Sequence, residues 1–168
     1  LYTAYKLLEK LDVHFVLHAG NLVAGDQPKR HREEVFLRTA DEQKDYVVAH
    51  YPRSKHFKTF IIAGQTDLSF KTKGGFNVVR AICQERDDLV YRGEESAQFL
   101  IHGELGPERA FKIDVMHPST DNVPYAKTYT FQRILEQIIA TFAFEPVLDP
   151  QKRCPNLVLA GGYNLPAL

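Results

Sequence analysis

The amino-acid sequence predicts a layered α/β fold built as one domain over residues 1–168. Short apolar strands alternate with amphipathic helices through the first half of the chain, a group of strands follows, and one helix and one strand come last. A chain of 168 residues with 44% apolar content is long enough for one buried core. Several strands are followed at once by Gly, Asn or His, where open α/β sheets gather their binding loops. We therefore expect a candidate site at the ends of the strands.

Apolar periodicity defines the elements expected in the first half. Helices are predicted at 2–11, 40–51 and 76–85, and strands at 14–17 and 59–63. The segment 20–32 is polar and contains Gly25, Asp26 and Pro28, so it is predicted to be a loop. Gly74 and Gly75 are predicted to lie in a surface turn before the third helix.

The second half is richer in strands. Strands are predicted at 89–91, 98–102, 112–116 and 156–160, with a turn at 103–107 and a helix at 131–142. The segment 118–127 is rich in Ser, Thr, Asp and Asn, which is typical of a loop. No repeat or interdomain linker separates these elements, so the prediction remains a single domain, with the alternative that it is a fragment of a longer chain.

Charge and cysteine content restrict the classes of function. Lys+Arg and Asp+Glu number 21 each, so no overall field favours nucleic acid or an anionic membrane, although nucleic-acid binding through a local patch stays open. No apolar run approaches the roughly 20 residues of a membrane span, which predicts a soluble protein without membrane contact. Cys83 and Cys154 lack metal-site spacing and are expected to be free thiols. A cytoplasmic or other reducing intracellular location is the corresponding expectation.

Four polar segments follow apolar strands and form the candidate site. The most informative is Gly64-Gln65-Thr66-Asp67, which follows the strand predicted at 59–63. The others are Gly20-Asn21, His117-Pro118 and the stretch Gly161-Gly162-Tyr163-Asn164. Because strand ends gather at one edge in α/β sheets, we expect these segments to converge.

These segments and their surroundings resemble the calcineurin-like metallophosphoesterase family. The stretches that carry the resemblance are 12–25, 40–43, 59–70, 116–118 with Tyr125, Ala126 and Gln132, and 155–164. The resemblance spans nearly the whole chain and implies the family's layered α/β-β/α sandwich. The family's first motif, Asp-x-His on its first strand, has no counterpart here, so the resemblance implies a sandwich that lacks that strand.

The family holds two metal ions, and the resemblance implies that this chain has lost most of their ligands. Asn21 stands at the bridging aspartate, and a neutral amide contributes no charge to hold two cations together. Gln65 stands at the asparagine ligand, while Gly162 and Asn164 stand at two histidines. Only His117 matches a ligand histidine intact, as a weak metal ligand by itself.

The same resemblance implies that the catalytic acid is lost. Thr66 stands where the family places the histidine that protonates the leaving group, and a hydroxyl is too weak an acid for that role. Asp67 matches the aspartate that orients this histidine, and it is expected to have nothing left to orient. His18 is expected to be satisfied by backbone groups, with a supporting position behind the site as the alternative.

The resulting hypothesis is a pseudoenzyme that serves as a scaffold or interaction module, with a protein partner or a larger assembly. No cofactor is expected; if one binds, it is a divalent metal such as Mn, Fe, Zn or Mg. One alternative is an active metal-dependent phosphoesterase or nuclease whose missing ligands come from the absent N-terminal strand or from residues such as Asp26 or Asp121. Another is a metal-free phosphate-binding module that uses Lys73, His117 and loop amides.

Overall fold

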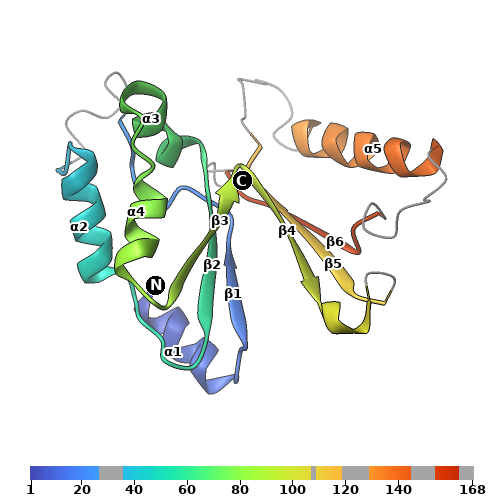
Figure 1. The fold of residues 1–168 in the computed structure, drawn as a ribbon, viewed down its shortest axis with the longest axis horizontal. Helices are drawn as coiled ribbons and strands as arrows, with labels where there is room; N and C mark the ends of the chain where they lie inside the picture. The colour runs from blue at the N-terminus through green and yellow to red at the C-terminus, as the bar shows by residue number, and fades with distance from the viewer. Residues whose placement is uncertain (27–35, 107–108, 119–128, 145–153, 163–168) are drawn as a thin grey trace.

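A computed structural model describes most of the chain. The described residues are 1–26, 36–106, 109–118, 129–144 and 154–162. Within them the protein is a mixed α/β structure with five α-helices and two three-stranded sheets. Figure 1 shows the two sheets side by side, with helices on the outer side of each.

The first sheet is parallel. Its strands are β1 (Phe15–His18), β2 (Lys58–Ala63) and β3 (Leu89–Glu94), in the order β1-β2-β3. The apolar runs predicted all three, although β3 extends to Glu94 rather than ending at residue 91. The register shifts between Ile61 and Ile62, which is an irregularity where β2 pairs with β3.

The second sheet is mixed. Its strands are β4 (Ser96–Ile101), β5 (Phe111–Met116) and β6 (Leu157–Ala160). β5 lies between the other two, antiparallel to β4 and parallel to β6. A short 3-10 helix, Gly103–Leu105, occupies the predicted turn between β4 and β5. All three strands were predicted to within two residues.

Four of the helices confirm the predicted periodicity. They are α1 (Tyr2–Lys10), α2 (Ala40–His50), α4 (Val78–Glu85) and α5 (Tyr129–Phe144). Figure 1 shows α2 and α4 beside the parallel sheet and α5 beside the second sheet. The layers therefore run helix, sheet, sheet, helix.

A further helix, α3 (Gln65–Gly74), was missed, and the surface turn predicted at Gly74-Gly75 is the exposed C-terminal end of this helix. The carboxylate of Asp67, in its first turn, accepts a hydrogen bond from the Gly64 backbone N–H at 2.8 Å. Gly75 ends the helix in the left-handed conformation, and its N–H bonds to the Lys71 carbonyl. An acidic residue near the start, lysines in the last turn and a glycine at the end were the available signals.

Alternate residues of β2 face opposite layers, which divides the core in two. Ile61 and Ala63 pack with Val78, Val79 and Ile82 of α4. Ile62 packs instead with residues of β5 in the second sheet. The ring of Phe60, on the same side as Ile62, lies 5.7 Å from the ring of Phe99 in β4. The packing between the two sheets brings their strand ends close together.

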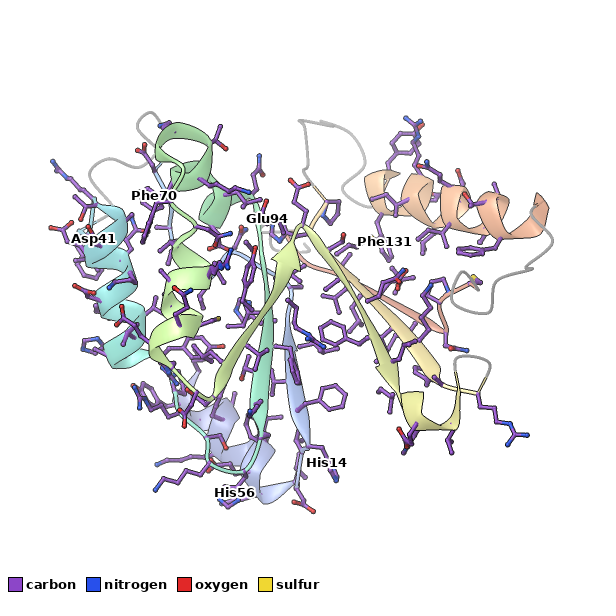
Figure 2. The ribbon with its side chains drawn as sticks, in the orientation of Figure 1. His14, Asp41, His56, Phe70, Glu94 and Phe131 are labelled. Atoms are coloured by element: carbon purple, nitrogen blue, oxygen red, sulfur yellow. The ribbon has the colours of Figure 1, made fainter. Side chains whose placement is uncertain are left out.

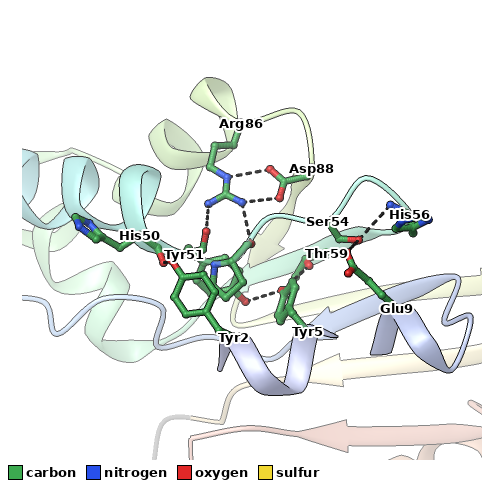
Figure 3. A network of polar contacts seen from close by, with 11 residues as sticks. Tyr2, Tyr5, Glu9, His50, Tyr51, Ser54, His56, Thr59, Arg86 and Asp88 are labelled. Atoms are coloured by element: carbon green, nitrogen blue, oxygen red, sulfur yellow. Dashed lines mark hydrogen bonds and ion pairs between the residues drawn. The ribbon is translucent and has the colours of Figure 1, made fainter. Parts of the chain in front are cut away.

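A buried polar network stabilises the far end of the parallel sheet (Figure 3). The guanidinium of Arg86 donates to both carboxylate oxygens of Asp88 and to the backbone carbonyls of Tyr51 and Pro52. The Arg86 side chain is fully buried, so these bonds compensate for its lost hydration. This network joins the end of α2 to the segment before β3.

The two cysteines are free thiols, as expected. Cys83 is partly covered on α4, and burial raises the pKa of its thiol to about 12, so the group stays protonated near neutral pH. Cys154 is exposed. None of the helices in the described part of the chain has both the length and the apolar character of a membrane span.

Candidate functional site

Loops after four strands meet at one edge of the sheets. Gly20 follows β1, Gly64 follows β2, His117 follows β5 and Gly162 follows β6. A Cβ atom built on Gly20 would lie 2.7 Å from both the Gly64 Cα and the His117 Nδ1. A Cβ built on Gly162 would lie 2.8 Å from the His117 Nε2. The sequence-based prediction that these loops converge is confirmed, and glycines allow the close approach.

His117 lies at the centre of this convergence and is 2% exposed. Its Nδ1 lies 2.7 Å from the Ala19 carbonyl oxygen, which can only accept, so Nδ1 carries the proton. The backbone N–H of His117 donates to the Glu95 carbonyl at 2.6 Å. The ring is therefore held between the two sheets with Nε2 directed at Gly162.

Asn21 and Thr66 are joined by hydrogen bonds. The Asn21 Oδ1 lies 3.1 Å from the Thr66 backbone N–H and 2.9 Å from the Thr66 hydroxyl. The same hydroxyl lies 2.7 Å from the Val23 carbonyl and donates its single proton to one of these two acceptors. Asn21 adopts a positive φ of 58°, which asparagine tolerates better than most residues. The amide at the predicted bridging position thus fastens one loop to the start of α3.

The Asp67 carboxylate has hydrogen-bond partners within the protein. The expectation that Asp67 has nothing left to orient was therefore incomplete. It is 1% exposed, and its two oxygens accept from the backbone N–H groups of Val23 and Gly64 at 2.9 and 2.8 Å. Burial raises the pKa of this carboxyl, and the backbone hydrogen bonds oppose that rise. Asp67 orients the two loops that follow β1 and β2.

Other predicted residues are not brought into this cluster. Gln65 is exposed in the first turn of α3. The Asp26 carboxylate lies 2.7 Å from the Lys73 ammonium, so the two residues expected to serve alternative sites pair with each other. Asn164 and Asp121 lie outside the described residues.

The donor groups at the convergence do not fit a dinuclear metal centre. The Asn21 Oδ1 and both Asp67 oxygens already accept hydrogen bonds from protein groups, and the His117 Nδ1 is protonated. The Nε2 of His117 is the remaining imidazole donor among these residues. No group of three or more His, Cys, Asp or Glu side chains in the described ranges could hold a metal ion. One imidazole without a carboxylate is a poor ligand set for hard or borderline dications.

His18 lies next to this cluster and corrects a sequence-based expectation. Among the described residues its buried Nδ1 has no hydrogen-bond partner, so backbone groups do not satisfy that atom. Its ring makes an edge contact with Tyr51, with ring centroids 6.3 Å apart. Burial lowers the pKa of His18, and the nearby His117 lowers it further. The ring is accordingly neutral near pH 7.

Gln43 is a positioning residue that the sequence analysis did not single out. It is 4% exposed on α2, and its side chain pairs with both the N–H and the carbonyl of Gly25. Its Nε2 also donates to the Leu37 carbonyl. Periodicity cannot detect this residue, because its partners are backbone groups of a loop remote in the sequence.

The described geometry defines a mixed α/β protein with glycine-lined loops closed around one histidine. Comparison with protein-family models, curated proteins and solved structures gave no match.

Proposed function

We propose that this chain is a metallophosphoesterase-like domain that has lost catalysis and serves as a scaffold or interaction module. The proposal combines the resemblance of its strand-end segments to that family with the layered arrangement of two sheets between helices. On this interpretation the chain keeps the family's site loops and has lost most of the family's metal ligands.

One observation carries the proposal: three polar side chains of the candidate site bond to the protein itself. Asn21 bonds to Thr66, Asp67 bonds to two backbone N–H groups, and His117 bonds to Ala19. An active site needs donors and acceptors directed at a substrate, with a general acid within reach of it. Here Asn21 and Asp67 connect loops in place of binding a ligand, and His117 is held through Nδ1 with its Nε2 not engaged by that bond.

The test is hydrolysis of bis(p-nitrophenyl) phosphate in the presence of excess Mn²⁺, assayed beside an active metallophosphoesterase. We expect wild type and His117→Ala to release p-nitrophenol at the same rate as buffer, because no acid or metal-held water is available. Isothermal titration with Mn²⁺ is expected to give no stoichiometric binding.

Two bound metal ions per chain, together with turnover that His117→Ala abolishes, would contradict the proposal. That result would favour the active phosphoesterase instead. If turnover is observed, Asp26→Asn tests whether Asp26 serves as a metal ligand. In the structure the Asp26 carboxylate pairs with Lys73 at the surface.

A further inference from the structure

A second site lies on the other face of the second sheet. A cavity of about 360 Å³ separates α5 from β4 and β5. Helix α5 contributes the apolar Ile134, Ile138 and Phe142 together with two polar side chains, and the polar groups that the sheet contributes include Gln98 and Asp114. Figure 2 shows side chains of α5, Phe131 among them, extending toward the sheet. The volume is within the range of pockets that bind small organic molecules.

Asp114 is an unusual group for such a wall. Its Oδ1 is buried and has no hydrogen-bond partner among the described residues. The neighbouring strand residues Ile113 and Val115 belong to the core between the sheets, so Asp114 faces the helix layer instead. A buried acceptor without a donor costs free energy, and native structures seldom keep one without a reason.

The Oδ1 atom of Asp114 can still accept a hydrogen bond. Burial raises the pKa of its carboxyl, whereas Lys112 and the Gln98 side chain lower it. Lys112 precedes it by two residues on the same face, and its ammonium lies 5.8 Å from the Phe142 ring. Gln98 lies opposite Asp114 in the β4–β5 register. A ligand that donates hydrogen bonds to the Oδ1 would satisfy the remaining acceptor.

We propose that this cavity binds a small organic amine. Its ammonium group donates to the Asp114 carboxylate, and its hydrocarbon part lies against Ile134, Ile138 and Phe142. An ammonium supplies the missing donor and an opposite charge, and a charge-assisted hydrogen bond is stronger than a neutral one. The apolar helix face removes the hydrocarbon part from water.

The experiment is titration of the ¹⁵N-labelled chain with hexylamine, followed by amide chemical shifts. We expect saturable shifts in β4, β5 and α5. Asp114→Asn keeps the size of the side chain and removes its charge, so it should weaken binding by about tenfold, the equivalent of one charge-assisted hydrogen bond. Asp87→Asn, at an exposed position remote from the cavity, should leave the affinity unchanged.

Two matched ligands and one further variant decide the chemistry. Hexan-1-ol should bind more weakly than hexylamine, and hexanoate should bind most weakly. Ile138→Trp fills the cavity from the helix side and should abolish the hexylamine shifts. The proposal is overturned by hexanoate binding as tightly as hexylamine, by unchanged affinity in Asp114→Asn, or by the absence of shifts at millimolar hexylamine.

Discussion

Asp67→Ala is expected to lower the free energy of unfolding by about 4 kcal/mol, because each buried backbone N–H left without an acceptor costs roughly 1–3 kcal/mol. The two affected groups are the N–H of Val23 and the N–H of Gly64. Both lie at the closed loops, and Asp67 itself is 1% exposed. Urea unfolding followed by circular dichroism measures the change.

Two further variants serve as comparisons for the stability of Asp67→Ala. Asp67→Asn keeps one acceptor and should be destabilised by roughly half as much, since one of the two N–H groups stays satisfied. Asp87→Ala, at an exposed position, should stay within about 0.5 kcal/mol of wild type. If Asp67→Ala were as stable as Asp87→Ala, the carboxylate would not be a structural link between the two loops.

Gly20→Ala is expected to cost about 4 kcal/mol, through left-handed backbone strain of about 1–2 kcal/mol and overpacking of about 1–3 kcal/mol. Gly20 has a φ of +90°, and its new Cβ would meet the Gly64 Cα and the His117 Nδ1 at 2.7 Å. Thermal and urea unfolding would both report the loss.

Alanine variants of two other glycines distinguish the cost of backbone strain from the cost of overpacking. Gly75 has a φ of +72° with nothing within 4 Å of an added Cβ, so Gly75→Ala should show strain alone, about 1 kcal/mol. Gly74 lies at the end of α3 with the same open surroundings, and Gly74→Ala should be neutral or stabilising by up to about 1 kcal/mol. A Gly20→Ala cost no larger than that of Gly75→Ala would mean that the loops are not tightly closed around His117.

Much of the fold was accessible from sequence because strands and amphipathic helices carry local patterns. β2 is an apolar run, and α4 places Val78, Val79 and Ile82 on one face. α3 was missed because its apolar residues are few, and its stability depends on the Asp67 cap and on the Gly75 terminus. Such signals involve single residues and are too short to define a helix by periodicity.

The candidate site could be predicted in position but not in detail. Asn21, Thr66 and His117 follow strands, so their convergence follows from topology. The partners of these side chains could not be predicted, because Asp67, Gln43 and His117 bond mainly to backbone groups of other loops. Backbone acceptors and donors leave no pattern in residue type.

The proposed loss of catalysis is compatible with a retained fold. Under the proposed resemblance, Asn21 stands at a metal-ligand position, and here it bonds within the protein, to Thr66. If the proposed function holds, a binding role is to be sought on the surfaces of the domain, including the cavity beneath α5.

The most direct test of the closed site is imidazole NMR of His117 with and without equimolar Mn²⁺, assigned by comparison with His117→Asn. The account predicts a ring that carries a proton on Nδ1, as the 2.7 Å contact with the Ala19 carbonyl requires, and ring signals that Mn²⁺ does not broaden. A ring protonated at Nε2, or His117 signals that disappear at one equivalent of Mn²⁺, would contradict it.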